Sequence, residues 1–493
     1  MSILKLPDEL LDSIVEDTLQ LSQRPILFLK SLRQVNHRFS RLHSILSDLF
    51  SKIQLIGNIE DIQNLTPEAL INSGVANYVR DVVFLPPLYC CMTFENFQDI
   101  FTWCAKWETG IYHPSRIRHL IAEQPSIWRS APKSPFLHTK EQLRIGFESY
   151  DAEAKASLEY IQDGQLVSHW SKILNLLPKA TNFRFRMVDY YCIDVDLKPM
   201  RPDCITKPRD HPVSYPNSLI VDEATALSDL FVSSVFQMLA QIDRKPSSLS
   251  FKHQSCPLES GWVEMYNLER LDMSHLRDIE IDPSLSMFAT QGYDYSQTRP
   301  AIKHMQEAIM SLLRGSAGSL ETLRWQWPRG RWTCGPISLP RLHSLILGWS
   351  GPYITAPVFV EWIQALPNLQ HFSVSGLSFT GSPPQEGHDD EDPEVDDEWA
   401  SASRQDMKNV LDVLREHKTL RKGHISFDSN GNNYYFDFIK DAPTTQFQVL
   451  ELEAAEEDLE EAYQYAEMSE WMSLYVSGHV GWHGIFDLEF TNH

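Results

Sequence analysis

The chain has 493 residues, of which 42% are hydrophobic, and its formal net charge is −23 at pH 7. The hydrophobic content is typical of a globular chain with a sizeable core and excludes a largely disordered polypeptide. The acidic balance repels phosphate backbones, so we expect no nucleic-acid binding. No apolar run approaches the roughly 20 residues that cross a bilayer, so we expect no membrane contact either.

The amino-terminal stretch and the cysteines indicate the compartment. Residues 1–19 carry acids where a signal peptide needs an unbroken apolar run, and a transit peptide would be rich in Arg and poor in acids. The seven cysteines are scattered and form no Cys-x-x-Cys pair, which argues against a zinc site or a redox pair. We therefore expect reduced, buried thiols in a cytoplasmic or nuclear protein.

Residues 1–55 have the spacing of short helices. Pro7 suits a first helical turn, and Asp8 and Glu9 suit the positive end of a helix dipole. The apolar positions that recur at helical spacing are Leu10, Leu11, Ile14, Val15, then Leu29, Leu32, Val35, Phe39, Leu42, and finally Leu46, Leu49, Phe50 and Ile53. Three short helices bury such positions only in part, so a partner protein is expected to cover the rest.

From residue 56 to residue 493 the pattern changes to short strand-like runs that alternate with helix-like stretches. We expect strands at Val79–Leu85, Ile117–Ile121, Phe183–Val188, Leu249–Lys252, Leu268–Met273, Leu320–Trp325, Leu342–Leu347, Leu369–Val374, Leu420–Phe427 and Phe447–Leu452. Asp428–Asn432 begins like a calcium loop but lacks its later ligands, so a hairpin turn is expected there.

Several of these runs share one local pattern. Leu339–Leu345 (LPRLHSL) matches Leu366–Phe372 (LPNLQHF), Ser319–Leu323 and Asn267–Leu271 share its core, and Leu176–Phe183 is a degraded copy. The distance from Leu320 to Leu342 is 22 residues, and from Leu342 to Leu369 it is 27. A period of 20–29 residues with Leu-x-x-Leu strands is typical of leucine-rich repeats, so the sequence favours an irregular α/β solenoid. The alternative is a compact α/β domain in which this spacing arises by chance.

Two segments concentrate the negative charge. His388–Trp399 holds eight acids and Glu451–Glu461 holds seven. Residues 381–403 are too charged and too rich in Pro and Gly to pack, which predicts a disordered surface loop. Solvation explains the charge of both segments, and a docking site for a basic partner is the alternative.

Three amino-terminal pieces lie in register with the F-box family. Leu6–Leu11 with Ile14 resembles its opening, Leu29–Phe39 resembles its second half, and Leu49–Ile53 resembles its closing turn. Asn36 and Phe39 stand where the family often has Cys and Trp. The resemblance implies a three-helix F-box over residues 1–55, followed by a leucine-rich-repeat-like domain over residues 56–493.

The resemblance also implies a function. F-box proteins bind a Skp-type adaptor and through it a cullin, and they hold a target protein for ubiquitination without making bonds themselves, so no catalytic, cofactor-binding or metal-binding residue is expected. Carried over position by position, the adaptor-binding residues are Leu6, Pro7, Leu10, Ile14, Leu32, Val35, Phe39, Leu49 and Phe50. Replacing Val35 by Asp should then abolish adaptor binding. The alternative is a repeat-based interaction scaffold whose amino-terminal helices cap the solenoid.

Other features remain open or are set aside. An aromatic run could supply contacts to the unknown protein target or could be core; it comprises Trp325, Trp327, Trp332, Trp349 and Tyr353. Gly348–Pro352 fails the nucleophile-elbow pattern at Pro352, and the pair Asp194 and Asp196 is too common a spacing to indicate a metal site. Phosphate-binding loops and His-Glu-x-x-His motifs are absent from the sequence.

Overall fold

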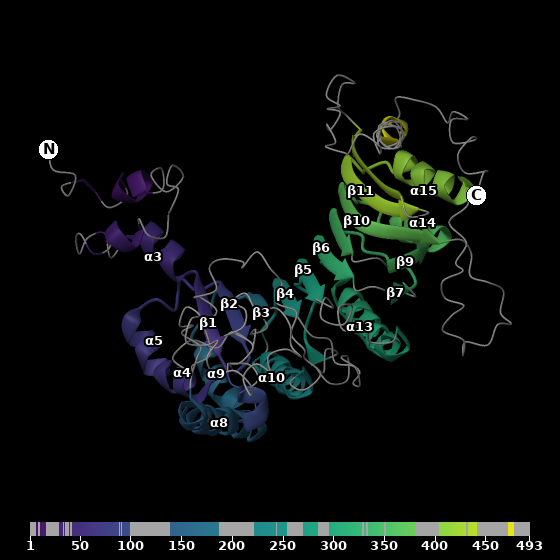
Figure 1. Cartoon of the computed structure of the whole chain (residues 1–493). Helices are drawn as coiled ribbons and strands as arrows, with labels where there is room; N and C mark the ends of the chain where they lie inside the picture. The colour runs from purple at the N-terminus through teal and green to yellow at the C-terminus, as the bar shows by residue number, and fades with distance from the viewer. Residues whose placement is uncertain are drawn as a thin grey trace, which may run out of the picture. The chain divides into compact units, whose positions relative to one another are not determined.

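The computed structural model describes residues 6–7, 10–15, 29–32, 34, 39, 42–87, 89, 91–98, 139–186, 221–242, 244–253, 270–283, 295–327, 330–331, 334–349, 352–380, 404–429, 432–440 and 472–477. The chain divides into two compact units, Met1–Ile242 (unit 1) and Asp243–His493 (unit 2). Figure 1 colours the elements in chain order. As the sequence predicts, the fold is mixed α/β, and its strands are mostly parallel.

Unit 1 contains three parallel strands that pair in chain order. They are β1 (Lys52–Ile56), β2 (Asp81–Leu85) and β3 (Asn182–Arg186). The helices of this unit are α3 (His43–Phe50), α4 (Ile59–Asn64), α5 (Pro67–Ser73), α8 (Lys140–Gln162), α9 (Gln165–Asn175) and α10 (Val221–Gln241). Strand β1 occupies part of the segment expected to be helical, because that segment turns at Ser51 and joins the sheet.

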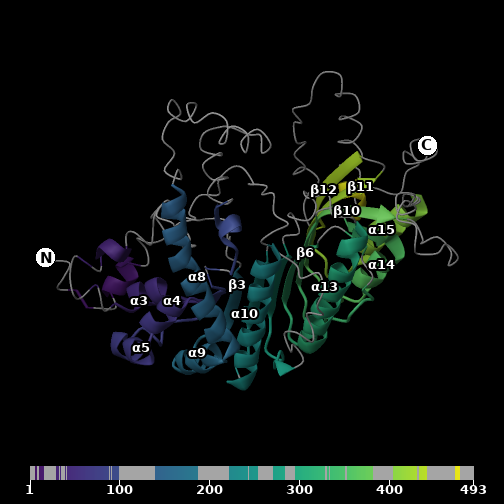
Figure 2. The same cartoon turned by 60° about the horizontal axis from the view of Figure 1, so that its bottom comes forward.

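Helices α8, α9 and α10 lie together in Figure 2. Aromatic rings join α9 and α10 to the sheet. Phe84 of β2 packs against Trp170 of α9 with ring centroids 5.8 Å apart, and Phe185 of β3 stacks on Phe236 of α10 at 5.0 Å. Local signals set the helix ends: a Thr139–Gln142 capping box starts α8, and Gly74 ends α5 at φ +68°.

Unit 2 contains a longer run of parallel strands, again paired in chain order. The run comprises β4 (Ser248–His253), β5 (Asp278–Pro283), β6 (Thr322–Trp327), β8 (Ser344–Trp349), β10 (His371–Thr380) and β11 (Lys422–Ser429). Strand β12 (Asn432–Ile439) pairs antiparallel with β11. This antiparallel pair confirms the hairpin expected at Asp428–Asn432.

The connections of unit 2 carry its helices and a small side ladder. The helices are α13 (Tyr295–Ser316), α14 (Ala356–Gln364) and α15 (Arg404–Glu416), and the short strands β7 (Gly330–Arg331) and β9 (Pro352–Thr355) pair with each other beside β10. Residues 472–476 form a further short helix, which Tyr475 fixes to α15 through a 2.5 Å hydrogen bond from its hydroxyl to Asp412.

One local arrangement recurs ahead of the strands. Leu342 just before β8 and Leu345 and Leu347 within it are buried. The corresponding residues, Leu369 just before β10 and Phe372 and Val374 within it, are also buried. The backbone carbonyl of His343 accepts hydrogen bonds from the N–H groups of Gln370 and His371, both at 2.9 Å. The same double acceptance occurs at the carbonyls of Ser51, Arg80, Ser247, Arg277, Glu321 and Gln370. Sharing one carbonyl in this way fixes the register of each strand on the next.

The prediction of a strand at Leu268–Met273 is wrong. Residues 270–273 are not a strand, and β5 begins instead at Asp278. Leu271, Met273 and Leu276 are buried in the turn ahead of β5, where the N–H of Leu276 donates to the carbonyl of Met273 at 3.0 Å. They occupy the place that Leu339 and Leu342 occupy ahead of β8, so buried leucines marked the turn and not the strand. The strands expected at Ile117–Ile121 and Phe447–Leu452 and the acidic segments lie outside the described residues.

We predict that Gly57→Ala destabilises unit 1. An added Cβ would lie 2.8 Å from Cδ of Pro87 and 3.0 Å from the Phe231 ring, so β1 could not approach the end of β2. Overpacking of this kind costs about 1–3 kcal/mol, measurable by urea denaturation. The matched control is Gly318→Ala, whose Cβ would meet nothing within 4 Å. Equal stability of the two variants would contradict the packing.

A second prediction concerns pH. The Nε2–H of His417 donates to the carbonyl of Leu366 at 2.9 Å, and burial lowers the pKa of His417. Because the unfolded chain binds a proton more readily, unit 2 should lose stability as pH falls below the unfolded value of about 6.5. His417→Gln retains an N–H donor and cannot titrate, so the urea midpoint of the wild type should fall more steeply between pH 7.5 and 5.5. Parallel pH profiles would contradict this role.

Candidate functional site

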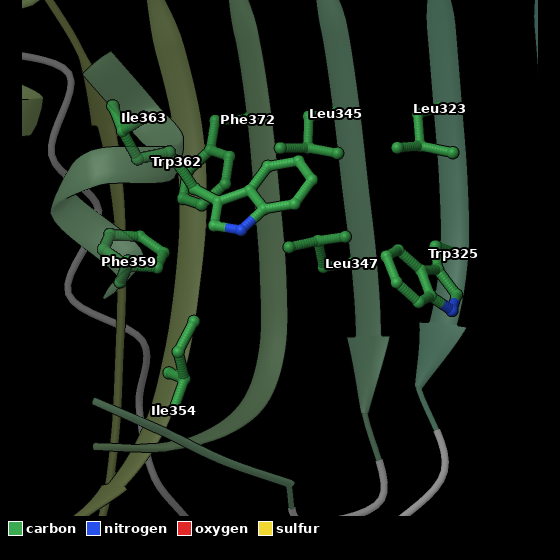
Figure 3. Close-up of a pocket in the computed structure, with 9 residues that line it drawn as sticks. All are labelled: Leu323, Trp325, Leu345, Leu347, Ile354, Phe359, Trp362, Ile363 and Phe372. Atoms are coloured by element: carbon green, nitrogen blue, oxygen red, sulfur yellow. The ribbon is translucent and has the colours of Figure 1, made fainter. Parts of the chain in front are cut away.

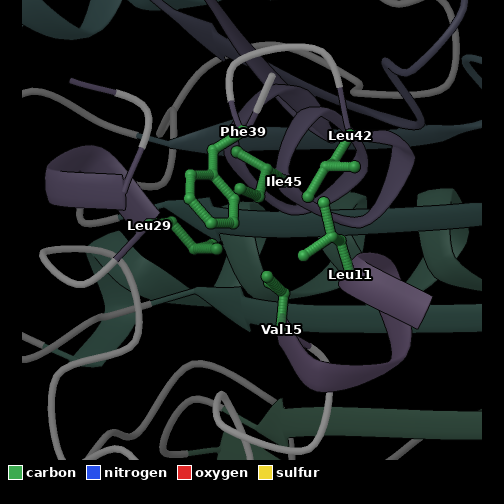
Figure 4. Packing of buried hydrophobic residues seen from close by; sticks show 6 residues of the cluster. All are labelled: Leu11, Val15, Leu29, Phe39, Leu42 and Ile45. Atoms are coloured by element: carbon green, nitrogen blue, oxygen red, sulfur yellow. The ribbon is translucent and has the colours of Figure 1, made fainter. Parts of the chain in front are cut away.

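The amino-terminal helices enclose a small core of their own. Its six buried residues are Leu11, Val15, Leu29, Phe39, Leu42 and Ile45, which Figure 4 shows converging from separate segments. The partly buried residues Leu6, Leu32 and Leu49 pack against this cluster. This core fixes the first helical residues on α3, since Leu42 and Ile45 lie at the start of that helix.

The helical residues 10–15 present two apolar faces. Leu11 and Val15 point into the cluster and are at most 3% exposed. Leu10 and Ile14 lie four residues apart on another face, where 53% and 40% of their surface is exposed. Pro7 precedes them at helical spacing and is also exposed. The two exposed apolar side chains lie on one face of the helix, which makes that face a candidate contact for another protein.

The nine predicted adaptor-binding residues therefore fall into different environments. Pro7, Leu10 and Ile14 are exposed and share one face. Leu6, Leu32 and Leu49 are partly buried against the cluster, Phe50 is half-buried, and Phe39 is 7% exposed within it. Val35 lies outside the described residues. Sequence periodicity could not separate the two faces, because Leu10 and Leu11 are neighbours with the same chemistry.

The cluster is joined closely to the sheet of unit 1. Helix α3 ends at Phe50 and β1 begins at Lys52, so Ser51 alone separates them. The carbonyl of Ser51 accepts from the N–H groups of Arg80 and Asp81, at 2.7 and 2.9 Å. The ring of His43 in α3 lies 5.4 Å from that of Tyr78. The Ser51 hydrogen bonds and the His43–Tyr78 ring contact thus attach helix α3 to unit 1. Residues 10–15, which pack on α3 through the cluster, are attached to unit 1 in the same way.

The outward face of the unit 1 sheet carries charge next to this junction. Arg184 of β3 contacts Asp81 of β2 at 3.3 Å, and Asn182 donates to the same carboxylate at 3.1 Å. Burial and the nearby Arg186 and Arg184 lower the pKa of Lys52, while Asp81 acts in the opposite direction. Asp81 contacts or attracts each of these polar side chains, so we interpret Lys52, Asp81, Asn182 and Arg184 as a structural charge cluster.

A small cavity in unit 2 has none of the polar groups that bind most small molecules. It lies between the inner faces of β6, β8 and β10 and helix α14 (Figure 3). Its lining is aliphatic and aromatic: Leu323, Trp325, Leu345, Leu347, Ile354, Phe359, Trp362, Ile363 and Phe372. Small-molecule sites combine apolar walls with a few convergent polar groups, so we assign this cavity to core packing.

One side chain of the aromatic run, that of Trp325, lies among the described residues. Trp325 is 1% exposed and belongs to the core beneath α14. The side chains of Trp327, Trp332, Trp349 and Tyr353 lie outside the described residues. Core packing, one of the two interpretations that the sequence left open, is confirmed for Trp325.

The described helices and the described acidic, His and Cys side chains were compared with what a membrane span and a metal site require. None of the described helices has both the length and the hydropathy needed to cross a bilayer. Nowhere in the described ranges do three His, Cys, Asp or Glu side chains gather as metal ligands would. Cys334 is buried, which raises the pKa of its thiol to about 12, and the thiol donates to Gln306 at 3.4 Å. That thiol is protonated at neutral pH and packs as part of the core.

Comparison with known proteins does not identify a family for this chain. No family model, no curated protein and no solved structure matches this chain. The exposed face of Pro7, Leu10 and Ile14 is the candidate site.

We predict opposite effects for neighbouring residues of this helix. Leu11→Ala should destabilise the cluster by about 2–5 kcal/mol, because Leu11 is fully buried and its loss leaves a cavity. Leu10→Ala removes an exposed side chain and should change the free energy of unfolding by no more than about 0.5 kcal/mol. Hydrogen exchange of α3 amides in the two variants would measure this, and equal exchange rates would contradict the assignment of the two faces.

Proposed function

We propose that the chain is the substrate-recognition subunit of a Skp–cullin–F-box ubiquitin ligase. The amino-terminal helices act as the F-box and dock on a Skp-type adaptor, and through it on a cullin. The parallel strands of each unit belong to an irregular leucine-rich-repeat-like domain that holds a target protein. The chain makes no bond itself, and it raises the effective concentration of the target near the conjugating enzyme. Such a receptor works in the cytoplasm or nucleus.

The exposed face of Pro7, Leu10 and Ile14 carries the proposal. Because Leu10 and Ile14 are 53% and 40% exposed, an adaptor that covers them would gain about half of the roughly 1.5–3 kcal/mol that full burial of such a side chain contributes. The helix is already folded on its own cluster, so docking does not require the cost of ordering it. Placement ahead of a series of parallel strands agrees with the domain order that the F-box resemblance implies.

The strand arrangement supports the solenoid part of the proposal. The strands pair in chain order within each unit, and the same three buried positions recur at β6 (Leu320, Leu323 and Trp325) and β8 (Leu342, Leu345 and Leu347). The shared-carbonyl hydrogen bonds repeat at each of these steps. Stacking of this kind buries faces that single repeats cannot bury alone.

The second candidate function is a repeat scaffold whose helices serve as a cap. The sealed cluster and the one-residue link at Ser51 favour it, since a cap needs both. A cap, however, would bury its remaining apolar face against the first strand, and Leu10 is 53% exposed. The exposure of that face therefore supports adaptor docking over capping.

We predict that Leu10→Asp combined with Ile14→Asp abolishes capture of a co-expressed Skp-type adaptor. Two carboxylates placed on the exposed face would be desolvated without partners in the complex, while the cluster beneath stays intact. The matched control is Ile71→Asp in α5, which adds a charge at a site that is 60% exposed. That control should retain the adaptor.

Adaptor capture is measured by affinity purification of the full chain. Circular dichroism and gel filtration of the purified proteins show whether each variant is folded. Undiminished capture by a folded double variant would overturn the proposed function, and so would a full chain that stays monodisperse and binds no adaptor.

A further inference from the structure

The starts of the last strands of unit 2 form a basic edge. The turns ahead of β8, β10 and β11 are residues 339–343, 366–370 and 417–421, and every charged side chain in them is basic or a histidine. Arg341, Lys418 and Arg421 are exposed there. These turns are aligned side by side, because the carbonyl of each fifth residue accepts from the start of the next strand. A chain with a net charge of −23 thus gathers cations along one short edge.

The first outward row of the sheet continues this edge. Ser344, His371, Lys422 and Ile439 are register partners on β8, β10, β11 and β12. Directly paired residues share one face of a sheet, so these four side chains form one row. His371 and Lys422 differ in depth: the first is half-buried and the second is exposed. Burial and the charges of Lys422, His343 and Arg421 lower the pKa of His371, which agrees with their proximity.

Ile439 gives the row an apolar end. It is 47% exposed, and it lies directly beside Lys422 on the antiparallel partner strand. Phe438, its neighbour in sequence, points inward and fills the space over Gly423, where any Cβ would lie 2.5 Å from the Phe438 ring. The alternation along β12 therefore holds Ile439 on the outward face. In the next row the His424 ring contacts the Asp437 carboxylate at 2.8 Å.

This combination selects a class of partner. The cations of this edge are Lys422 in the row and Arg341, Lys418 and Arg421 in the turns, and they attract carboxylates or phosphates. The exposed Ile439 beside Lys422 favours a ligand with its own aliphatic side chain. Nucleic acids supply phosphates but no aliphatic group, and the overall charge repels long polyanions. In an extended peptide, side chains on one face repeat about every 7 Å, and neighbouring strands lie about 4.8 Å apart. The two spacings differ, so the proposed contact requires only one carboxylate near Lys422 and one aliphatic side chain near Ile439.

We propose that His371, Lys422 and Ile439 bind an acidic segment of the target protein, with an aliphatic side chain of that segment seated on Ile439. The inference rests on the proposed receptor function, because it names the class of target that the repeat domain holds. It does not depend on the adaptor surface, which lies in unit 1.

The test uses the purified full chain and fluorescein-labelled peptides in anisotropy titrations at about 50 mM salt. The probes are an acidic peptide with leucines, EEDLEEDL, the same peptide with serines, EEDSEEDS, and a basic peptide, KKKLKKKL. The leucine peptide should bind about tenfold tighter than the serine peptide, the basic peptide should not bind, and added salt should weaken binding. Equal binding of acidic and basic peptides, or tighter binding of a single-stranded oligonucleotide, would overturn the proposal.

Variants assign the site. Lys422→Glu should weaken binding of the leucine peptide at least about fivefold, and Ile439→Ser should weaken it about tenfold. Lys179→Glu makes the same charge change at an exposed turn of unit 1 and should alter affinity less than twofold. Unchanged binding by a folded Lys422→Glu protein would refute the site.

The acidic run of the chain itself is the competing occupant. A variant with the seven acids of Glu451–Glu461 replaced by Ser should bind the peptide as the wild type does. If that variant alone binds, the edge serves the chain's own run and the proposal of a separate target fails. Adaptor capture is scored on the same preparations, so loss of peptide binding with intact capture would sink this inference and leave the receptor function standing.

Discussion

The shared backbone carbonyl at each strand start is the constraint on which the rest of the structure depends. A carbonyl such as that of His343 has two lone pairs, and it uses them for two successive N–H groups of the neighbouring chain segment. This leaves no freedom to shift a strand by one residue, a shift that would turn every buried leucine outward. The lengths of the connections can then vary widely, as between β6 and β8 and between β10 and β11, without changing the register.

That register assigns each strand residue to one of two environments. Inner positions such as Leu345, Leu347 and Phe372 pack beneath helix α14, where Trp362 also donates its indole N–H to the carbonyl of Cys334 at 2.9 Å. Side chains at the outer positions do not pack in the core, so they are available for contacts with other molecules. The basic edge is built from outer positions and turns, and a buried scaffold therefore sets the spacing of an exposed surface.

The amino-terminal helix follows a different principle. Successive helical residues lie about 100° apart, so Leu10 and Leu11 point to different sides although both are leucines. Leu11 with Val15 completes the small cluster on α3, and Leu10 with Ile14 stays outside it. Receptor and cap both need the inner face, and only a docking protein needs the outer one. The proposed function therefore depends on which side of one helix turn a side chain lies.

The sequence by itself determined the mixed α/β class, the recurrence of buried Leu-x-x-Leu turns, and most strand positions after residue 180, because period-2 burial and turn chemistry are local. It placed the strand near residue 270 too early, since leucines of a turn and of a strand are equally buried. Only the tertiary structure showed that Leu10 is exposed while Leu11 is buried, and that Phe39 and Trp325 lie in the core. It also placed His371, Lys422 and Ile439 in one row. These facts depend on contacts between residues far apart in the chain, and local patterning does not encode which of two apolar faces the rest of the fold covers.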